Sequence, residues 1–288
     1  MGLNQLEWLT KLHNTLTMGN YGKGTLRNYN MEMRLLFQYH HRKEVEDITA
    51  EDITQYILFI KTAHGVGRAK CRSVAQSCAF FFRHVMPKPF VLPSKMYPRK
   101  AFVLPQVMTQ VQVKHLLGSI EDIRQYAVIS LLYGTGIRIG ELKNLKFSDI
   151  ERANNRLLIR QGKGQKDRYV LLPHLALKAI ENYYRVYKPE VYLFESQQIK
   201  HCPMHERSLQ TIVNTAMAKA GFKGQGFTAH TLRHSFATHL LDNGCDIHAI
   251  KTLLGHAKIE TTMVYLHLQQ SKRDVLQSPL DTLLARNE

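Results

Sequence analysis

The stretch F-T-A-H-T-L-R-H-S-F-A-T-H-L-L-D-N-G, residues 227–244, places three histidines and one arginine on a single expected helix. On a helical wheel of about 100° per residue, His239 falls on the side of Leu232. His230, Arg233 and His234 fall on the opposite side. His239 is therefore expected in the core, and the question is what the opposite, polar face binds.

A phosphate fits this polar face better than a metal ion does. His230 and His234 stand four residues apart, but zinc needs further ligands, no His-Glu-x-x-His pattern supplies them, and Arg233 repels cations. A guanidinium offers a planar fork of donors to two phosphate oxygens, and a neighbouring histidine can contact a third. Taken alone, the face could also be simply solvated. His234 is expected to have a structural or supporting role.

Composition favours a globular, two-domain protein that binds a polyanion. The chain has 288 residues, 44% of them hydrophobic, and 39 Lys and Arg against 23 Asp and Glu give a net charge of +16. The excess is shared equally by the parts before and after residue 100, which favours nucleic acid as the partner. The four cysteines form no Cys-x-x-Cys pair, and no apolar run reaches the roughly 18 residues of a membrane span. We expect a reduced, cytoplasmic protein without contact to a membrane.

The first hundred residues have the apolar period of short helices, within 6–16, 25–42, 50–64 and 67–86. Five prolines between residues 87 and 105 then predict an extended segment, because proline fits neither a helix interior nor a central strand. We place a helical domain at 1–94 and a basic linker at 95–107. Basic residues expected to contact phosphates are Lys23, Arg27, Arg68, Lys70 and Arg72 in the helical domain, and Lys95, Arg99 and Lys100 in the linker.

The second part is mainly helical, with one change of period. Helices are expected within 111–120, 121–136, 174–187, 206–221, 230–244, 246–255 and 261–270. Between them, R-L-L-I-R-Q and D-R-Y-V-L-L flank G-K-G-Q-K, which predicts two antiparallel strands joined by a hairpin. The fold class is therefore mainly α with a small antiparallel sheet, with domain boundaries at 108–270 and a separate tail at 271–288.

Four further positions share the phosphate chemistry of the opening stretch. Arg138 follows a Gly-Thr-Gly turn near an expected helix start, and Lys163 lies in the hairpin turn. His256 follows the Gly that ends one helix, and Tyr265 is expected on the next. Each has an ordinary alternative when taken alone: a surface arginine, a solvated turn, a helix cap and a packed aromatic.

Together these motifs resemble the tyrosine recombinases, the family of phage-type integrases and Xer recombinases. T-G-I-R-I-G-E-L, G-K-G-Q-K-D-R, H-T-L-R-H-S-F-A-T-H-L-L-D-N-G, L-L-G-H and T-T-M-V-Y-L-H stand in the family's order across about residues 108–270. The resemblance implies a SAM-like helical domain that binds the DNA core site, followed by a mixed α/β catalytic domain. It implies the catalytic set Arg138, Lys163, His230, Arg233, His256 and Tyr265.

The mechanism implied by the resemblance needs neither metal nor cofactor. Tyr265 attacks a DNA phosphodiester and forms a 3′-phosphotyrosyl ester, while Arg138 and Arg233 stabilise the charge that builds on phosphorus. His230 receives the tyrosine's proton or positions it, and Lys163 protonates the departing 5′ oxygen. Glu141 is expected to orient the site's cations, and Lys166 and Arg168 are further candidates for DNA contact. The family acts as a homotetramer on paired inverted-repeat core sites in double-stranded DNA, through a Holliday junction.

Other functions explain the sequence less well. A type IB topoisomerase uses similar chemistry, but the compact size and the tail, with its apolar Leu280, Leu283 and Leu284, favour a recombinase whose tail packs on a neighbouring subunit. Tyrosine nucleases that use a metal need a His-x-His pair, and none of the 15 histidines stands two residues from another. A regulatory or architectural DNA-binding protein would not need the complete set. We expect integration or excision of a mobile element, with dimer resolution or DNA inversion as alternatives.

Overall fold

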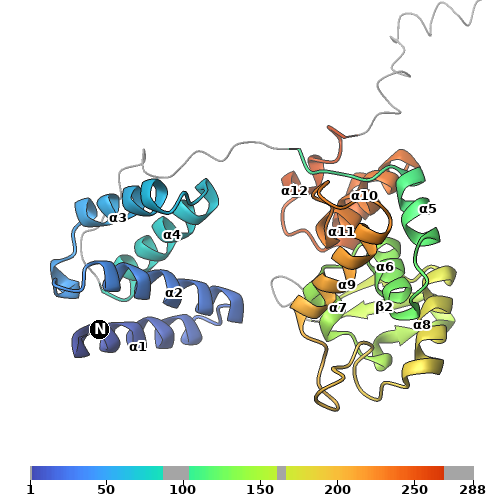
Figure 1. The fold of residues 1–288 in the computed structure, drawn as a ribbon, viewed down its shortest axis with the longest axis horizontal. Coiled ribbons are helices and arrows are strands. Elements are labelled where there is room, and N and C mark those ends of the chain that lie inside the picture. The colour runs from blue at the N-terminus through green and yellow to red at the C-terminus, as the bar shows by residue number, and fades with distance from the viewer. Residues whose placement is uncertain (1, 87–103, 161–166, 269–288) are drawn as a thin grey trace, which may run out of the picture. The chain divides into compact units, whose positions relative to one another are not determined.

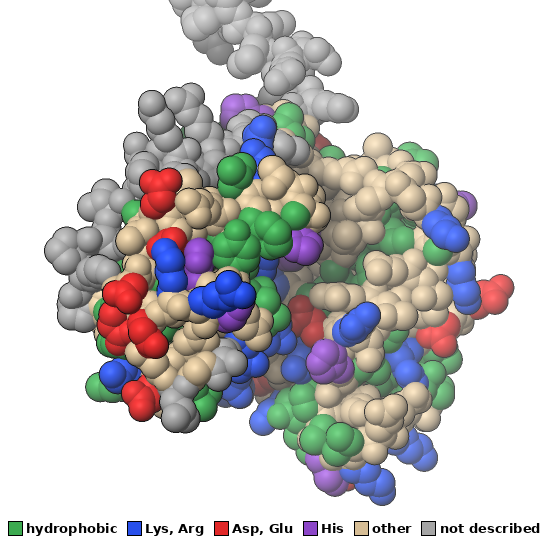
Figure 2. All heavy atoms as spheres, turned by 60° about the vertical axis from the view of Figure 1, so that its left-hand side comes forward, with side chains coloured by type: hydrophobic (Ala, Val, Ile, Leu, Met, Phe, Trp, Pro, Cys, Tyr) green, Lys and Arg blue, Asp and Glu red, His purple; other side chains and the backbone are tan. Residues whose placement is uncertain are grey.

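The structure is a computed structural model that describes residues 2–86, 104–160 and 167–268. The chain divides into two units, Met1–Phe102 and Val103–Glu288 (Figure 1). Several residues of the sequence predictions lie outside the described residues: Lys95, Arg99, Lys100, Lys163, Lys166, Leu280, Leu283 and Leu284. Lys and Arg side chains lie at several separate places on the face drawn in Figure 2, as the net charge of +16 leads one to expect.

Unit 1 is a bundle of the four helices that the sequence predicts. They are α1 (Leu3–Met18), α2 (Lys23–Tyr39), α3 (Ala50–Ala63) and α4 (Arg68–His84), with a 3-10 turn η1 (Val45–Asp47) before α3. Their apolar faces meet in one core that includes Leu12, Leu36, Phe37 and Phe81.

Polar side chains fix two helix positions in unit 1. A capping box fixes the start of α3, where Thr49 and Asp52 exchange hydrogen bonds with each other's backbone. The carboxylate of Glu32 is buried at 1% exposure, and Lys70 Nζ donates to both of its oxygens at 2.7 Å. This ion pair joins α2 to α4.

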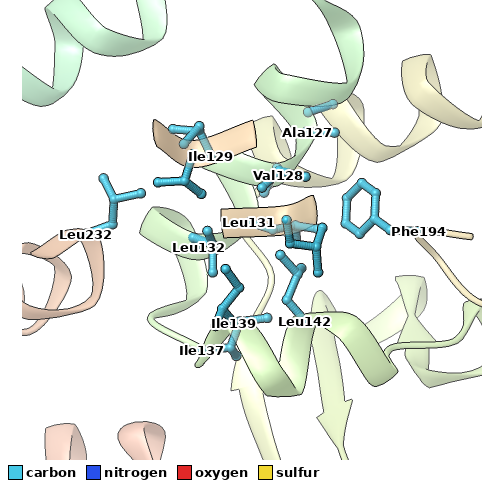
Figure 3. Packing of buried hydrophobic residues seen from close by; sticks show 14 of the residues in the cluster. Ala127, Val128, Ile129, Leu131, Leu132, Ile137, Ile139, Leu142, Phe194 and Leu232 are labelled. Atoms are coloured by element: carbon cyan, nitrogen blue, oxygen red, sulfur yellow. The ribbon is translucent and has the colours of Figure 1, made fainter. Parts of the chain in front are cut away.

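Unit 2 is built around helix α6 (Ile123–Thr135), which is buried along most of its length. Residues 127–132 are all buried, so this helix has core contacts on every side. It packs on α8 (His174–Tyr187), α9 (Glu206–Lys219) and α10 (Ala229–Asp242), and Figure 3 shows Ile129 of α6 beside Leu232 of α10. The remaining helices are α5 (Gln110–Gly118), α7 (Ile139–Asn144), α11 (Ile247–Leu254) and α12 (Glu260–Met263).

The sheet of unit 2 has three antiparallel strands in the order β1-β2-β3. They are β1 (Ile150–Glu151), β2 (Arg156–Ile159) and β3 (Arg168–Leu171), with short 3-10 turns at Phe147–Asp149 (η3) and Arg152–Asn154 (η4). Ile159 pairs with Arg168, so β2 and β3 form the predicted hairpin. Strand β3 contacts both α6 and α11. The predicted fold class, mainly α with a small antiparallel sheet, is confirmed.

Within the described ranges, none of the helices is both long and apolar enough to cross a membrane.

Candidate active site

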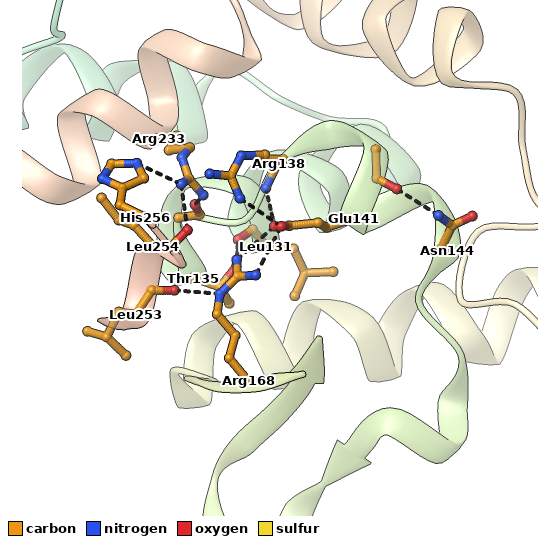
Figure 4. A network of polar contacts seen from close by, with 12 residues as sticks. Leu131, Thr135, Arg138, Glu141, Asn144, Arg168, Arg233, Leu253, Leu254 and His256 are labelled. Carbon is orange, nitrogen blue, oxygen red and sulfur yellow. Dashed lines mark hydrogen bonds and ion pairs between the residues drawn. The ribbon is translucent and has the colours of Figure 1, made fainter. Parts of the chain in front are cut away.

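Arg233 lies inside unit 2 instead of on a solvated face of its helix. Its side chain is only 3% exposed, and its guanidinium donates to the carbonyl of Gly136 at 2.6 Å and to that of Leu254 at 2.7 Å (Figure 4). These carbonyls belong to the ends of α6 and α11, where the negative end of a helix dipole favours a cation. Burial, and then the charge of Arg138, lower the pKa of Arg233 to about 10, so it stays charged at neutral pH.

The turns that present these carbonyls require glycine. Gly136 and Gly255 both adopt the left-handed conformation, with φ of +64° and +63°. A Cβ on Gly136 would also lie 2.2 Å from Phe236 of α10. The Gly-Thr-Gly turn before Arg138 therefore has two roles: it ends α6, and it allows α6 and α10 to pack closely.

Arg138 and Arg168 share one carboxylate, that of Glu141. Arg138 is the residue that caps α7, as the sequence predicts, and its Nη1 lies 2.9 Å from Glu141 Oε1. Arg168 contacts both oxygens of Glu141, at 3.0 and 2.8 Å, and its Nε donates to the carbonyl of Leu253 at 2.9 Å (Figure 4). Burial alone would raise the pKa of Glu141, but the hydrogen bonds from Arg168 and Arg138 hold it at about 2. The carboxylate therefore orients Arg138, as expected for Glu141.

Arg168 differs from the sequence prediction. It is a candidate DNA contact by sequence, but its side chain is only 10% exposed and three of its five N–H groups donate to Glu141 and to the carbonyl of Leu253. Val170, two residues further along β3 and on the same face, is buried, whereas Tyr169, on the opposite face, is exposed. The alternation of the strand thus turns Arg168 inward, where it binds Glu141 instead of lying on the surface of the unit.

His256 is held between Arg233 and Thr262. Its Nε2 lies 3.1 Å from Arg233 Nη2, and its Nδ1 lies 2.9 Å from the hydroxyl of Thr262. Because a guanidinium can only donate, Nε2 accepts and the ring carries its proton on Nδ1. Burial and the charges of Arg233 and Arg138 lower the pKa of His256 to about 4, which agrees with a neutral ring. In this arrangement His256 orients Arg233.

Tyr265 lies in the same cluster, with its hydroxyl 2.9 Å from Nδ1 of His234. The sequence predicts a helix at 261–270, but α12 ends at Met263 and Tyr265 lies in the turn that follows. Its side chain is 1% exposed, and its ring is stacked 6.4 Å from that of His256. Burial raises the pKa of Tyr265, although the charges of Arg233 and Arg138 oppose this rise.

The three histidines of the opening stretch have three different environments. His230 is exposed at the first turn of α10, with its ring 6.5 Å from that of His234. His234 contacts Tyr265, and burial, His230 and Arg233 lower its pKa to about 4. His239 is buried, as predicted, and bonds to the hydroxyl of Tyr133 at 2.9 Å. The described residues contain no group of three or more His, Cys, Asp or Glu that could hold a metal ion.

The candidate DNA contacts in unit 1 have different environments: two of them line a groove, and one forms an ion pair with a buried carboxylate. Lys23 and Arg27 line a groove of about 540 Å³ between α1 and α2, together with Arg34 and His13, which the sequence reasoning missed. The spacing of Lys23, Arg27 and Arg34 along α2 is the signal that could have revealed this face. Arg68 is exposed and Arg72 half-buried. Lys70 is ion-paired with buried Glu32, which makes it a structural residue more than a free phosphate contact.

The chain belongs to the phage integrase family of tyrosine recombinases, enzymes that break and rejoin DNA at specific sites. The model of the phage integrase family matches residues 106–272, and that of the phage integrase N-terminal SAM-like domain matches residues 8–90. Both the family and the SAM-like domain that the sequence predicts are thereby confirmed.

Similar proteins include both integrases and Xer recombinases. The putative integrase/recombinase y4qK of Sinorhizobium fredii is 31% identical over 270 residues, which are 90% of this chain and 86% of that one. Tyrosine recombinase XerA of Pyrococcus furiosus is 41% identical over 172 residues, 58% of this chain and 59% of that one. A crystal structure of XerA recombinase is 28% identical, with a TM-score of 0.54, and covers 94% of this chain and 97% of that one.

Proposed function

We propose that Tyr265 is the nucleophile with which this recombinase cleaves DNA, and that Arg138 and Arg233 bind the phosphodiester that it attacks. One observation carries the proposal: Tyr265, His256 and Arg233 form one contact cluster, although they come from three segments of the chain. The ring of Tyr265 stacks on that of His256, which bonds to Arg233, and the Tyr265 hydroxyl bonds to His234, the residue next to Arg233. Arg233 uses three donors on Gly136, Leu254 and His256. A guanidinium has five N–H donors, so about two remain for phosphate oxygens.

The chemistry of a phosphodiester explains why two arginines are needed. Attack on phosphorus builds negative charge on the non-bridging oxygens, and fixed donors lower the barrier because they need no reorganisation. Loss of one such donor typically raises the barrier by about 3 kcal/mol or more. Glu141 fixes Arg138, and the two helix-end carbonyls and His256 fix Arg233, so both cations are oriented before DNA binds.

Two more residues of the expected set complete the proposal. His230, exposed one turn before His234, contacts the bound phosphate and positions it. Lys163 donates a proton to the departing 5′ oxygen. It follows Arg160 by three residues, and Arg160 is bonded to buried Asp149 at 2.6 Å.

The product is a 3′-phosphotyrosyl enzyme, from which religation to a partner strand proceeds through a Holliday junction without ATP or metal. We propose that residues 1–94 and the linker 95–107 bind inverted-repeat core sites beside the catalytic domain at 108–270. A homotetramer forms on paired sites, and the tail at 271–288 packs on a neighbouring subunit. Integration or excision of a mobile element in the cytoplasm is the role we favour, supported by the similarity to y4qK over most of both chains. Dimer resolution is the second candidate, supported by the similarity to XerA.

The chemistry is tested with a nicked suicide duplex. Core sites are first selected from randomised duplexes by binding to the Tyr265→Phe variant, whose fold is checked by circular dichroism. Wild type incubated with the nicked site and EDTA should give a covalent complex on a denaturing gel, attached to the 3′ end of the cut strand. Tyr265→Phe should give none, and Tyr184→Phe, a change at an exposed tyrosine of α8, should behave as wild type. A wild type without a complex, or a complex from Tyr265→Phe, would contradict the proposal.

The biological role is tested in cells with the selected site. Two plasmids that each carry the site should fuse if the protein integrates DNA. Deletion between direct repeats without any fusion would instead support resolution.

A further inference from the structure

We propose that His234, and not His230, is the catalytic residue that receives the phenolic proton of Tyr265 during attack. This inference rests on the proposed function only in taking Tyr265 as the nucleophile. Its basis is the distance of 2.9 Å between His234 Nδ1 and the Tyr265 hydroxyl, which is a full hydrogen bond to the atom that reacts. His230 and His234 are four residues apart, so they lie on the same face of α10 in successive turns.

The burial of Tyr265 restricts what can take its proton. A side chain that is 1% exposed has little access to bulk water, so the acceptor has to be a group already in contact with the hydroxyl. Among the described residues, the hydrogen-bond partner of this hydroxyl is His234. His256 stacks on the same ring, but both of its nitrogens are engaged, with Arg233 and with Thr262.

The protonation state of His234 suits a proton acceptor. Burial, together with the positive charge of Arg233, keeps its ring neutral at pH 7, so Nδ1 can offer a lone pair to the phenol when Nε2 carries the proton. The ionisable groups around it are His230, Arg233, His256 and Tyr265. A bound phosphate anion offsets the charge of Arg233 and thereby makes His234 more basic. The strength of the base thus increases when substrate is present.

The proposed step balances without another reactant. The O–H bond of Tyr265 breaks and its proton passes to Nδ1 of His234, while the phenolic oxygen forms a bond to phosphorus. The bond from phosphorus to the 5′ oxygen breaks, and that oxygen takes a proton from Lys163. In religation the same transfers run in reverse, and His234 returns the proton to Tyr265.

Three variants measured with the selected nicked site separate a base from a structural residue. His234→Ala should cleave about 10² to 10⁴ times more slowly than wild type, the range for loss of a general base. His234→Asn keeps a hydrogen-bonding group near the position of Nδ1 but cannot take a proton, and it should remain at least tenfold slower than wild type. His248→Ala, at an exposed histidine of the adjacent helix α11, should match wild type. Binding of the site and circular dichroism confirm that each variant is folded.

Two chemical substitutions make the test specific. Difluorotyrosine at position 265 has a more acidic phenol, so it should reduce the defect of His234→Ala at least tenfold. A substrate with sulfur in place of the bridging 5′ oxygen has a good leaving group, so it should rescue Lys163→Ala and leave the defect of His234→Ala unchanged. The proposal is overturned if His234→Asn cleaves at the wild-type rate, if difluorotyrosine gives no rescue, or if sulfur rescues His234→Ala. Absence of cleavage by wild type would instead reject the proposed function.

Discussion

Replacement of Glu141 by glutamine tests whether one buried carboxylate holds the arginines of the site together. Its side chain is 9% exposed and contacts Arg138 and Arg168, the latter itself 10% exposed. Removal of one partner from a buried ion pair leaves a buried charge uncompensated, which costs about 3–5 kcal/mol. The pKa of Glu141 leads to a similar figure: about 2 in the folded chain against an ordinary 4.5 corresponds to about 3 kcal/mol.

The assay uses the position of the chain's single tryptophan. Trp8 is in α1, so its fluorescence reports the unfolding of unit 1, whereas circular dichroism reports both units. With a urea dependence of about 2 kcal/mol per M, Glu141→Gln should lower the midpoint of the unit 2 transition by about 1.5 M. The fluorescence transition should not move. Glu151→Gln, which removes a surface pair with Arg156, should leave both transitions at their wild-type midpoints.

The pH dependence gives the reasoning a second test. The folded-state pKa of Glu141 lies below its unfolded value, so its contribution is complete above about pH 4.5 and is lost as the pH falls towards 2. The difference between wild type and Glu141→Gln should therefore shrink between pH 4.5 and pH 2. A loss below 1 kcal/mol at pH 7, or a difference that grows on acidification, would refute the account.

Three further predictions concern other parts of the molecule. Asp52→Asn should destabilise unit 1 by about 1–2 kcal/mol at pH 7, because it weakens the capping box of α3; Trp8 fluorescence measures this loss. Since the pKa of Asp52 is held at about 2, the loss should become smaller as the pH falls below 3.8. Gly136→Ala should lower the free energy of unfolding, measured with urea, by several kcal/mol, because the new Cβ meets Phe236 and the backbone is left-handed. Gly67→Ala, where a Cβ meets open space, should lower it by less than about 1 kcal/mol. Arg27→Gln should weaken DNA binding and reduce the slope of log K against log salt by about 1, and an unchanged slope would exclude a phosphate contact there.

The helix positions and the helix start at Arg138 could be predicted from the sequence because both are encoded locally. Apolar spacing located the helices of both units, and the Gly-Thr-Gly turn placed Arg138 at a helix start. The predicted end of the last helix was wrong: a helix is expected at 261–270, but α12 ends at Met263. Thr262 contacts His256 through its hydroxyl, a contact that apolar spacing does not encode.

The partners of the site residues could not be predicted, because they are distant in sequence. Arg233 bonds to Gly136, 97 residues away, and Arg168 to Leu253, 85 residues away. The wheel separated His239 from Arg233 correctly, but for the face of Arg233 it offered only phosphate or solvent as partners. That face is covered by the ends of α6 and α11, and the positions of these helix ends depend on the fold of the whole unit. For Arg168, the alternation of inward and outward side chains along β3 was the signal that could have predicted its inward position.

The cluster of Arg138, Arg168 and Arg233 around the one carboxylate of Glu141 has a practical consequence for handling the protein. Both histidines beside it are neutral at pH 7, so the cluster carries an excess of two positive charges. Any tetrahedral oxyanion small enough to enter, such as phosphate, sulfate or vanadate, gains from this excess and competes with the DNA backbone for the same donors. Phosphate or sulfate buffers should therefore raise the melting temperature of the protein while they depress its apparent affinity for DNA, and assays of this enzyme are best run in chloride or glutamate salts.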